Sequence, residues 1–163
     1  MICYDLASKY CKNNECGHLS DCVNSHDSRS IIKCIENRKQ YSLINDLKLN
    51  IINFHLDGAV IKSSTQKKCD YIVLPTNANN NVVILVELKG SCYNTAISQI
   101  YETIRLYDKN FVGYKIYARI ICGGVPNIQN TPCVLQLKRE LLKSGGNLVS
   151  KTISLEEKLS KLV

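Results

Sequence analysis

Three runs rich in Val, Ile and Leu stand in the middle of the chain and are separated by polar segments. They cover Ile51 to Lys62, Asp70 to Pro75 and Val82 to Lys89. Apolar runs of this kind, bounded by polar residues, are typical of β-strands. The linking segments, 63–68 and 76–81, are short and hydrophilic, as hairpin loops are. The pattern therefore predicts three successive strands in an antiparallel meander.

Helical spacing of apolar residues is found on both sides of this meander. Before it, a helix that a serine could cap is predicted from Ser28 to about Gln40 by the spacing of Ile31, Ile32 and Ile35. After it, a helix is predicted from about Tyr93 to Tyr107 because five apolar residues share one face: Ala96, Ile97, Ile100, Ile104 and Tyr107. Each of these helices has one apolar stripe to bury.

Two further elements complete the expected order. Val112 to Cys122 predicts a fourth strand ended by two glycines, and Cys133 to Lys143 predicts a helix closed by Gly145 and Gly146. The order αβββαβα predicts an α/β fold, in which a four-stranded mixed sheet is flanked by the helices near 29–40 and 93–107. Residues 28–163 would form this core, and residues 1–27 would be a polar segment of the same domain.

The segment 1–27 is rich in cysteine and histidine. His18, Cys22 and His26 would share one face of a helix, and Cys11 or Cys16 could add a fourth ligand, which makes a zinc site one hypothesis. The spacing matches no standard zinc finger. Scattered reduced thiols are therefore the favoured interpretation.

Composition narrows the class of protein. A chain of 163 residues with 45% hydrophobic content can bury one sizeable core. The net charge of +7 favours polyanionic partners such as nucleic acid or an anionic membrane face. No stretch approaches the length of a membrane span, and the first residues lack the features of a signal peptide, so no membrane association is expected. Nine cysteines without a disulfide framework favour a reducing compartment, and a cytoplasmic location is expected.

The chemistry-bearing residues lie in the second and third predicted strands. Glu87 and Lys89 are two apart, so their side chains point to the same face of a strand. If Pro75 pairs with Val82, position i pairs with position 157 minus i, and Asp70 falls opposite Glu87. Two directly opposed carboxylates repel unless a cation neutralises them. The sequence therefore predicts a divalent metal site at this pair.

Hard oxygen ligands suit Mg²⁺ or Mn²⁺, with water, a substrate phosphate and the backbone carbonyl of Leu88 as further ligands. Such an ion can polarise a phosphoryl oxygen and lower the pKa of a bound water. Lys89 could hold that water and offset negative charge in the transition state. The predicted reaction is phosphodiester hydrolysis.

This arrangement resembles a known family. Cys69 and Asp70, followed after sixteen residues by Glu87, Leu88 and Lys89 on successive strands, are similar to the motif of the PD-(D/E)xK nuclease superfamily, over residues 28–122. The resemblance implies a restriction-endonuclease-like αβββαβ core. It also implies that the aspartate and the glutamate bind the metal and that the lysine assists the attacking water.

The resemblance suggests supporting residues as well. Family members often carry an acidic residue on the first helix and a glutamine on the helix after the lysine strand, for which Glu36 and Gln99 are the candidates. Asp57 is another possible metal-site or substrate residue. In one branch of the family a tyrosine lies four residues beyond the glutamine, where this chain has Thr103. The lysines 62, 67 and 68 could hold phosphates, with a solvated loop as an equal alternative.

Two functions remain open from the sequence. The first is a metal-dependent nuclease acting on nucleic acid, with DNA favoured, in a restriction, repair, recombination or defence context. A homodimer is possible because one site per chain would need two copies to cut both strands. The alternative is a catalytically inactive nuclease-like module that binds nucleic acid or a partner protein. A Glu-x-Lys pair alone could also be only a surface ion pair.

Overall fold

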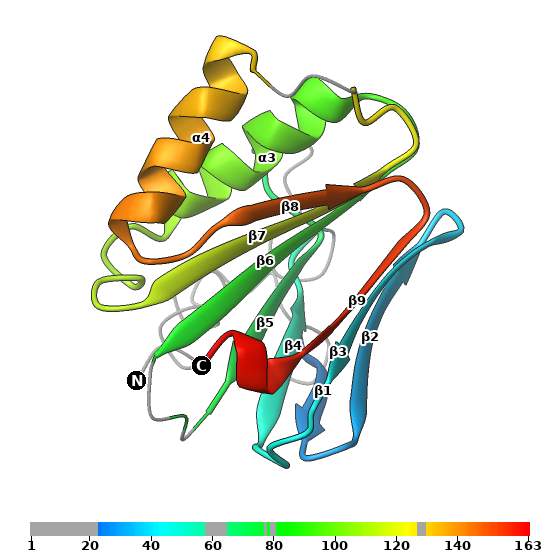
Figure 1. Cartoon of the computed structure of the whole chain (residues 1–163), viewed down its shortest axis with the longest axis vertical. Helices are drawn as coiled ribbons and strands as arrows, with labels where there is room; N and C mark the ends of the chain where they lie inside the picture. Colours follow the sequence, from blue (N-terminus) through cyan, green and yellow to red (C-terminus); the bar gives the residue numbers. More distant parts are fainter. Residues whose placement is uncertain (1–22, 58–64, 77, 79–80, 127–129) are drawn as a thin grey trace.

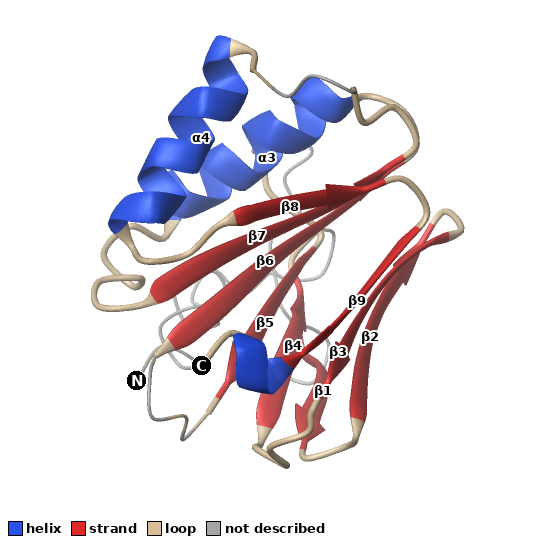
Figure 2. Ribbon diagram, in the orientation of Figure 1, coloured by secondary structure: helices blue, strands red, loops and turns tan. Residues whose placement is uncertain are grey.

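Three layers of secondary structure make up the computed structural model, which describes residues 23–57, 65–76, 78, 81–126 and 130–163. A six-stranded sheet lies in the middle, and the helices α3 (Tyr93–Leu106) and α4 (Pro132–Lys143) cover one of its faces (Figures 1 and 2). A three-stranded sheet packs on the opposite face. The expected α/β class is confirmed. None of the helices in these residue ranges is long and apolar enough to cross a membrane.

The central sheet contains the predicted meander. Its strands lie in the order β1 (Val23–Asp27), β4 (Ile51–His55), β5 (Tyr71–Pro75), β6 (Val82–Lys89), β7 (Lys115–Cys122) and β8 (Leu148–Lys151). Neighbours from β1 to β6 are antiparallel, whereas β6, β7 and β8 are parallel. The expectation of a mixed sheet is confirmed. The expectation of four strands is wrong, because β1 and β8 extend the sheet at its two edges.

The register between β5 and β6 is the one the sequence predicts. Tyr71 pairs with Val86, and Ile72 pairs with Leu85. The numbers of each pair add up to 157, so the same register places Asp70 opposite Glu87. A shift by one residue would have turned these side chains to opposite faces of the sheet.

The helix predicted for residues 28–40 is wrong. These residues instead belong to a hairpin of β2 (Ile31–Glu36) and β3 (Lys39–Ile44). Ile32 is buried, whereas Ile31 and Ile35 are 42% and 55% exposed. The strand carries isoleucines on both of its faces, and their combined spacing is the same as that of one face of a helix. The buried positions alone alternate with a period of two, as in a strand.

The hairpin turn consists of Asn37 and Arg38. Their φ angles are +49° and +61°, so both adopt the left-handed conformation that a two-residue turn of type I′ requires. Asparagine tolerates this conformation readily, but arginine adopts it at a steric cost. The backbone conformation of Arg38 therefore does not stabilise the turn.

The second sheet is completed by β9 (Ser154–Lys158), which runs parallel to β3. Sequence analysis predicted neither β8 nor β9. Arg119 of β7 is 1% exposed and donates two hydrogen bonds to Glu157 of β9, at 2.6 and 3.1 Å. The hydroxyl of Tyr41 in β3 donates a further bond of 2.8 Å to the same carboxylate. A buried, charge-assisted network thus joins the two sheets. The single turn η1 (Leu159–Lys161) follows β9.

Side chains of the central strands alternate between two cores. Ile72 and Leu85 face the helices, whereas Val73 and Ile84 face the three-stranded sheet. Because β5 and β6 are covered on both sides, they consist of apolar residues almost throughout. The charged residues at the ends of these strands are therefore exceptions that need a chemical reason.

The first segment is described only in part. Residues 23–27 form β1, so His26 lies in a strand rather than on a helix, and the helical zinc site is wrong at that position. The remaining zinc candidates, Cys11, Cys16, His18 and Cys22, lie outside the described residues, as do Lys62 and residues 58–62 of the first predicted strand.

Candidate active site

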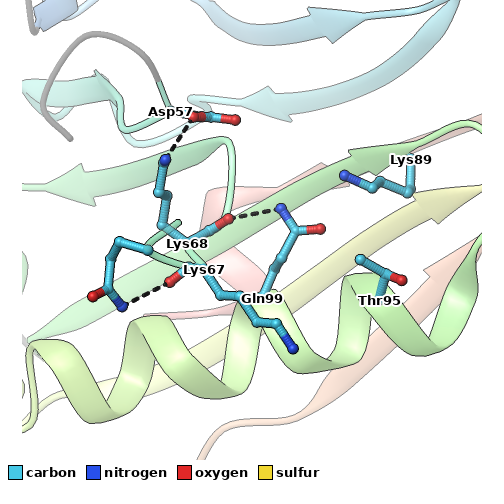
Figure 3. A pocket seen from close by; sticks show the side chains of 7 residues that line it. Asp57, Lys67, Lys68, Lys89, Thr95 and Gln99 are labelled. Atoms are coloured by element: carbon cyan, nitrogen blue, oxygen red, sulfur yellow. Dashed lines mark hydrogen bonds and ion pairs between the residues drawn. The ribbon is translucent and has the colours of Figure 1, made fainter. Parts of the chain in front are cut away.

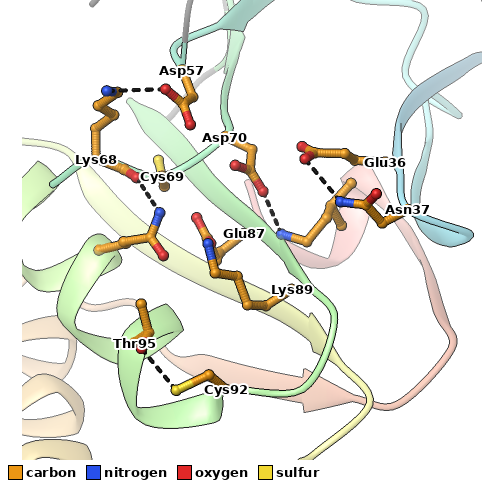
Figure 4. A network of polar contacts seen from close by, with 12 residues as sticks. Glu36, Asn37, Asp57, Lys68, Cys69, Asp70, Glu87, Lys89, Cys92 and Thr95 are labelled. Carbon is orange, nitrogen blue, oxygen red and sulfur yellow. Dashed lines mark hydrogen bonds and ion pairs between the residues drawn. The ribbon is translucent and has the colours of Figure 1, made fainter. Parts of the chain in front are cut away.

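Two carboxylates lie side by side at one end of the antiparallel pair formed by β5 and β6. Glu87 is near the end of β6, and Asp70 directly precedes β5 (Figure 4). The side chains are buried, with 0% of Glu87 and 4% of Asp70 exposed. The backbone N–H of Leu88 donates a 2.6 Å hydrogen bond to Asp70 Oδ2. The two strands therefore hold the Asp70 carboxylate beside Glu87.

Glu87 lacks the partners that a buried carboxylate ordinarily has. Within the described part of the chain, neither Oε1 nor Oε2 accepts a hydrogen bond. Lys89 Nζ lies 3.5 Å from Oε1, but the lysine side chain is 34% exposed. An ion pair of this length and exposure compensates only part of the cost of burying the charge.

The pKa values of both acids reflect this environment. Burial, together with the charge of Asp70, raises the pKa of Glu87 to about 9. Burial likewise raises the pKa of Asp70 to about 7, although the hydrogen bond from Leu88 acts in the opposite direction. Without a cation the pair therefore retains protons at neutral pH. Perturbed carboxylates of this kind are concentrated at functional sites.

Helix α3 adds a third buried acceptor. Gln99 is 8% exposed, and its Nε2 donates a 2.9 Å hydrogen bond to the carbonyl oxygen of Lys68 (Figure 3). Because a carbonyl can only accept, this bond fixes the orientation of the amide. Gln99 Oε1 then has no partner among the described residues. The glutamine is thus buried rather than exposed to solvent.

Thr103 lies one turn further along α3 and anchors the start of β5. Its hydroxyl donates a 2.8 Å hydrogen bond to the carbonyl of Gln99 and accepts a 2.8 Å bond from the backbone N–H of Cys69. Both Thr103 and Cys69 are 0% exposed. Sequence reasoning gave this residue no role. The contact ties the helix that carries Gln99 to the residue before Asp70.

Glu36 lies near the site, although not on the predicted helix. It is the last residue of β2 and is half-buried, and Asn37 Nδ2 donates a 3.1 Å bond to its carboxylate (Figure 4). Its negative charge contributes to the raised pKa of Asp70. The hairpin thus brings Glu36 to the acidic pair from the opposite layer.

Asp57 lies just beyond β4 and contacts Lys68. Lys68 Nζ is 3.0 Å from Asp57 Oδ1, and the exposed fractions of the two side chains are 5% and 50%. The negative charge of Asp57 also raises the pKa of Asp70. Asp57 therefore acts on the acidic pair through its charge while it neutralises a buried lysine.

A polar pocket of about 280 Å³ opens beside the carboxylates. Its lining combines three cations, one anion and three polar side chains: Lys67, Lys68, Lys89, Asp57, Gln66, Thr95 and Gln99 (Figure 3). Lys89 and Gln99 therefore belong to the pocket as well as to the surroundings of the acidic pair.

The donor set of the site fits a hard divalent cation. Three buried acceptors without a hydrogen bond, two on Glu87 and one on Gln99, accompany the Asp70 carboxylate. Among the residues described, no three His, Cys, Asp or Glu side chains are close enough to hold a metal together. Protein carboxylates would thus supply two ligands, and water, substrate or the Leu88 carbonyl the others, as Mg²⁺ commonly requires.

Comparison with known proteins supplies no family for this chain. No protein-family model, no curated protein and no solved structure matches it at a significant level.

Proposed function

We propose that this protein is a metal-dependent nuclease that hydrolyses phosphodiester bonds of nucleic acid, with DNA as the favoured substrate. The observation that carries the proposal is the fully buried Glu87 carboxylate, whose oxygens accept no hydrogen bond from the described residues and which lies beside Asp70 and Lys89. Burying such a group costs several kcal/mol unless a cation compensates it. A bound Mg²⁺ or Mn²⁺ supplies that compensation.

The proposed mechanism assigns one task to each side chain. Asp70 and Glu87 hold the cation, which polarises a phosphoryl oxygen and activates water when bound. Lys89 reaches the open side of the pair, where its ammonium can orient the attacking water and offset developing negative charge. Gln99 Oε1 can accept a hydrogen bond from a water at the site.

The order of elements supports the restriction-endonuclease-like part of the proposal. The β4–β5–β6 meander, α3 and β7 follow one another as the βββαβ portion of that core does. Asp70 directly precedes the second strand of the meander, and Glu87 is on the third. The net charge of +7 favours a polyanionic substrate. We extend the proposal to a homodimer that cuts both strands and to a cytoplasmic setting, where Mg²⁺ is abundant and thiols stay reduced.

Two observations favour the alternative of a binding module. No set of three acidic or imidazole ligands is assembled in the described residues, and one oxygen of Asp70 is already bonded to Leu88 N–H. An inactive protein with protonated carboxyls would have the same geometry. It would bind DNA without metal and would not cleave it.

Calorimetric titration with Mg²⁺ or Mn²⁺, combined with a cleavage assay, tests the proposal. We expect wild type to degrade plasmid or oligonucleotide only with metal, and Glu87→Gln and Asp70→Ala to lose both metal affinity and cleavage. Lys89→Ala should lose cleavage but keep metal binding. Glu140→Gln is the matched control, because Glu140 is a partly exposed glutamate whose partner is Lys143. Undiminished cleavage by Glu87→Gln would exclude this mechanism.

A further inference from the structure

The pocket beside the acidic pair is strongly basic. Three of its seven lining residues are lysines, Lys67, Lys68 and Lys89, against the single carboxylate of Asp57. The described lining therefore carries a net charge of about +2 at neutral pH. A pocket of this charge favours an anion with several oxygens.

The lysines differ in how much of their charge is available to a ligand. Lys68 is buried and lies 3.0 Å from Asp57, so much of its charge is neutralised within the protein. Lys67 is exposed, and its Nζ donates a 3.1 Å bond to the hydroxyl of Ser98, which holds the ammonium over α3. The Ser98 hydroxyl is neutral, so this hydrogen bond does not compensate the positive charge of Lys67. Lys67 therefore presents more available charge at the pocket than Lys68, and Lys89 shares its charge with Glu87.

The buried amide of Gln99 also indicates that the pocket receives a ligand. Gln99 lines the same pocket, and its buried Oε1 has no donor within the described residues, while its Nε2 is occupied by the Lys68 carbonyl. An unpaired buried acceptor costs about 1–3 kcal/mol unless a ligand or a bound water supplies a donor. A phosphate offers the lysines an anion, and a water bound with the phosphate offers this acceptor a donor.

We propose that this pocket binds a phosphate group of the nucleic-acid strand, next to the bond that is cleaved. The inference rests on the proposed function, because Lys89 joins the pocket to the acidic pair. Its volume of about 280 Å³ equals that of about nine water molecules, which is enough for a phosphate with its sugar. The bound phosphate belongs either to a strand end or to the continuous backbone.

Metal-free binding of a fluorescent oligonucleotide, followed by anisotropy in EDTA over a series of salt concentrations, tests the pocket without requiring cleavage. We expect Lys67→Ala to weaken binding about tenfold at low salt. In Lys67→Ala, the plot of the logarithm of the binding constant against the logarithm of the salt concentration should become less steep. Its slope should decrease in magnitude by about 0.7 for a single strand and by about 0.9 for a duplex. Lys67→Glu should have a larger effect in the same direction.

Lys109→Ala and Lys109→Glu are the matched controls. Lys109 is also exposed, but it follows the far end of α3, a helix about 21 Å long. Its substitution therefore changes the net charge by the same amount as the substitution of Lys67, but at a distance from the pocket. Because both lysines are exposed, all four variants should fold, and thermal unfolding should verify this. The same effect at positions 67 and 109, or no binding by wild type at low salt, would overturn the inference.

Oligonucleotides with and without a 5′- or 3′-terminal phosphate identify the source of the group. If the Lys67 effect requires a terminal phosphate, the pocket binds strand ends, and if it does not, the pocket binds the backbone. Both outcomes support the pocket. A Lys67-specific effect without metal-dependent cleavage refutes only the nuclease proposal, whereas cleavage by wild type with equal effects at positions 67 and 109 refutes only the pocket.

Discussion

Replacing Glu87 with glutamine should change how the stability of the metal-free protein depends on pH. In the unfolded chain this carboxyl titrates near its ordinary pKa of 4.5, whereas in the folded protein burial and Asp70 raise its pKa to about 9. Between these values the folded state keeps a proton that the unfolded state releases. The free energy of unfolding therefore falls as pH rises through this window, and the stability is fully present only below the unfolded pKa.

The magnitude follows from the width of the window. Each pH unit between the two pKa values lowers the free energy of unfolding by about 1.4 kcal/mol. Wild type should therefore lose about 3 kcal/mol of stability between about pH 5 and pH 7 through Glu87 alone. A glutamine cannot ionise and should lose none of this. Saturating Mg²⁺ should remove most of the difference, because a cation that binds only the folded state replaces the proton and stabilises that state.

Urea unfolding in EDTA at several pH values, repeated with Mg²⁺, measures the effect. Glu140→Gln serves as control, since a surface pair with Lys143 is worth at most about 1 kcal/mol and should leave the pH profile unchanged. Parallel pH profiles for wild type and Glu87→Gln would mean that Lys89 already compensates the charge. The reasoning that leads from a buried, unpartnered carboxylate to a metal site would then be refuted.

Three further substitutions test the framework around the site by denaturant unfolding. Glu157→Ala should cost about 3–5 kcal/mol, because it leaves the buried Arg119 without its carboxylate partner, and a loss under about 1 kcal/mol would contradict this. Thr103→Val should cost about 1–3 kcal/mol through the unpaired N–H of Cys69 and should also slow cleavage, whereas wild-type stability would exclude an anchoring role. Arg38→Gly should stabilise by about 0.5–1 kcal/mol by relieving the left-handed conformation, and a destabilisation would show that the arginine side chain contributes compensating contacts.

The central part of the fold could be predicted because its sequence pattern admits one interpretation. The strands of Ile72 and Leu85 are apolar on both faces, and the helix from Tyr93 has a single apolar stripe. Pairing Pro75 with Val82 across the polar turn gave the correct register, and with it the proximity of Asp70 and Glu87.

The second sheet could not be predicted for physical reasons. Ile31 and Ile35 lie on the exposed face of β2, so apolar residues on both faces concealed the alternation. The turn of Asn37 and Arg38 lacks the glycine that usually marks a two-residue hairpin. Strand β9 alternates between exposed and half-buried residues, and it is defined by its long-range pairing with β3.

The sequence predicted the positions of Glu87 and Lys89 in the candidate site better than it predicted the burial of Gln99. Alternation along β6 placed Glu87 and Lys89 on one face, and Lys89 Nζ does lie within 3.5 Å of the carboxylate. Burial of Gln99 could not be read from a polar residue at one helix position, because it depends on the packing of α3 over Lys68. The metal, the reaction and the substrate stay predictions.

The parallel pairing of β3 with β9 has a consequence for the order in which the molecule folds. Gln40 pairs with Ser154, so the two strands are separated by more than a hundred residues, and closing such a loop costs about 4 kcal/mol of chain entropy. During synthesis the meander and α3 can assemble from local contacts, but the β2–β3 hairpin cannot acquire its second neighbour until residues 154–158 have left the ribosome. Glu36 at the tip of that hairpin would consequently reach the acidic pair last. A nascent chain would therefore complete the core between the central sheet and the helices before it completes its site.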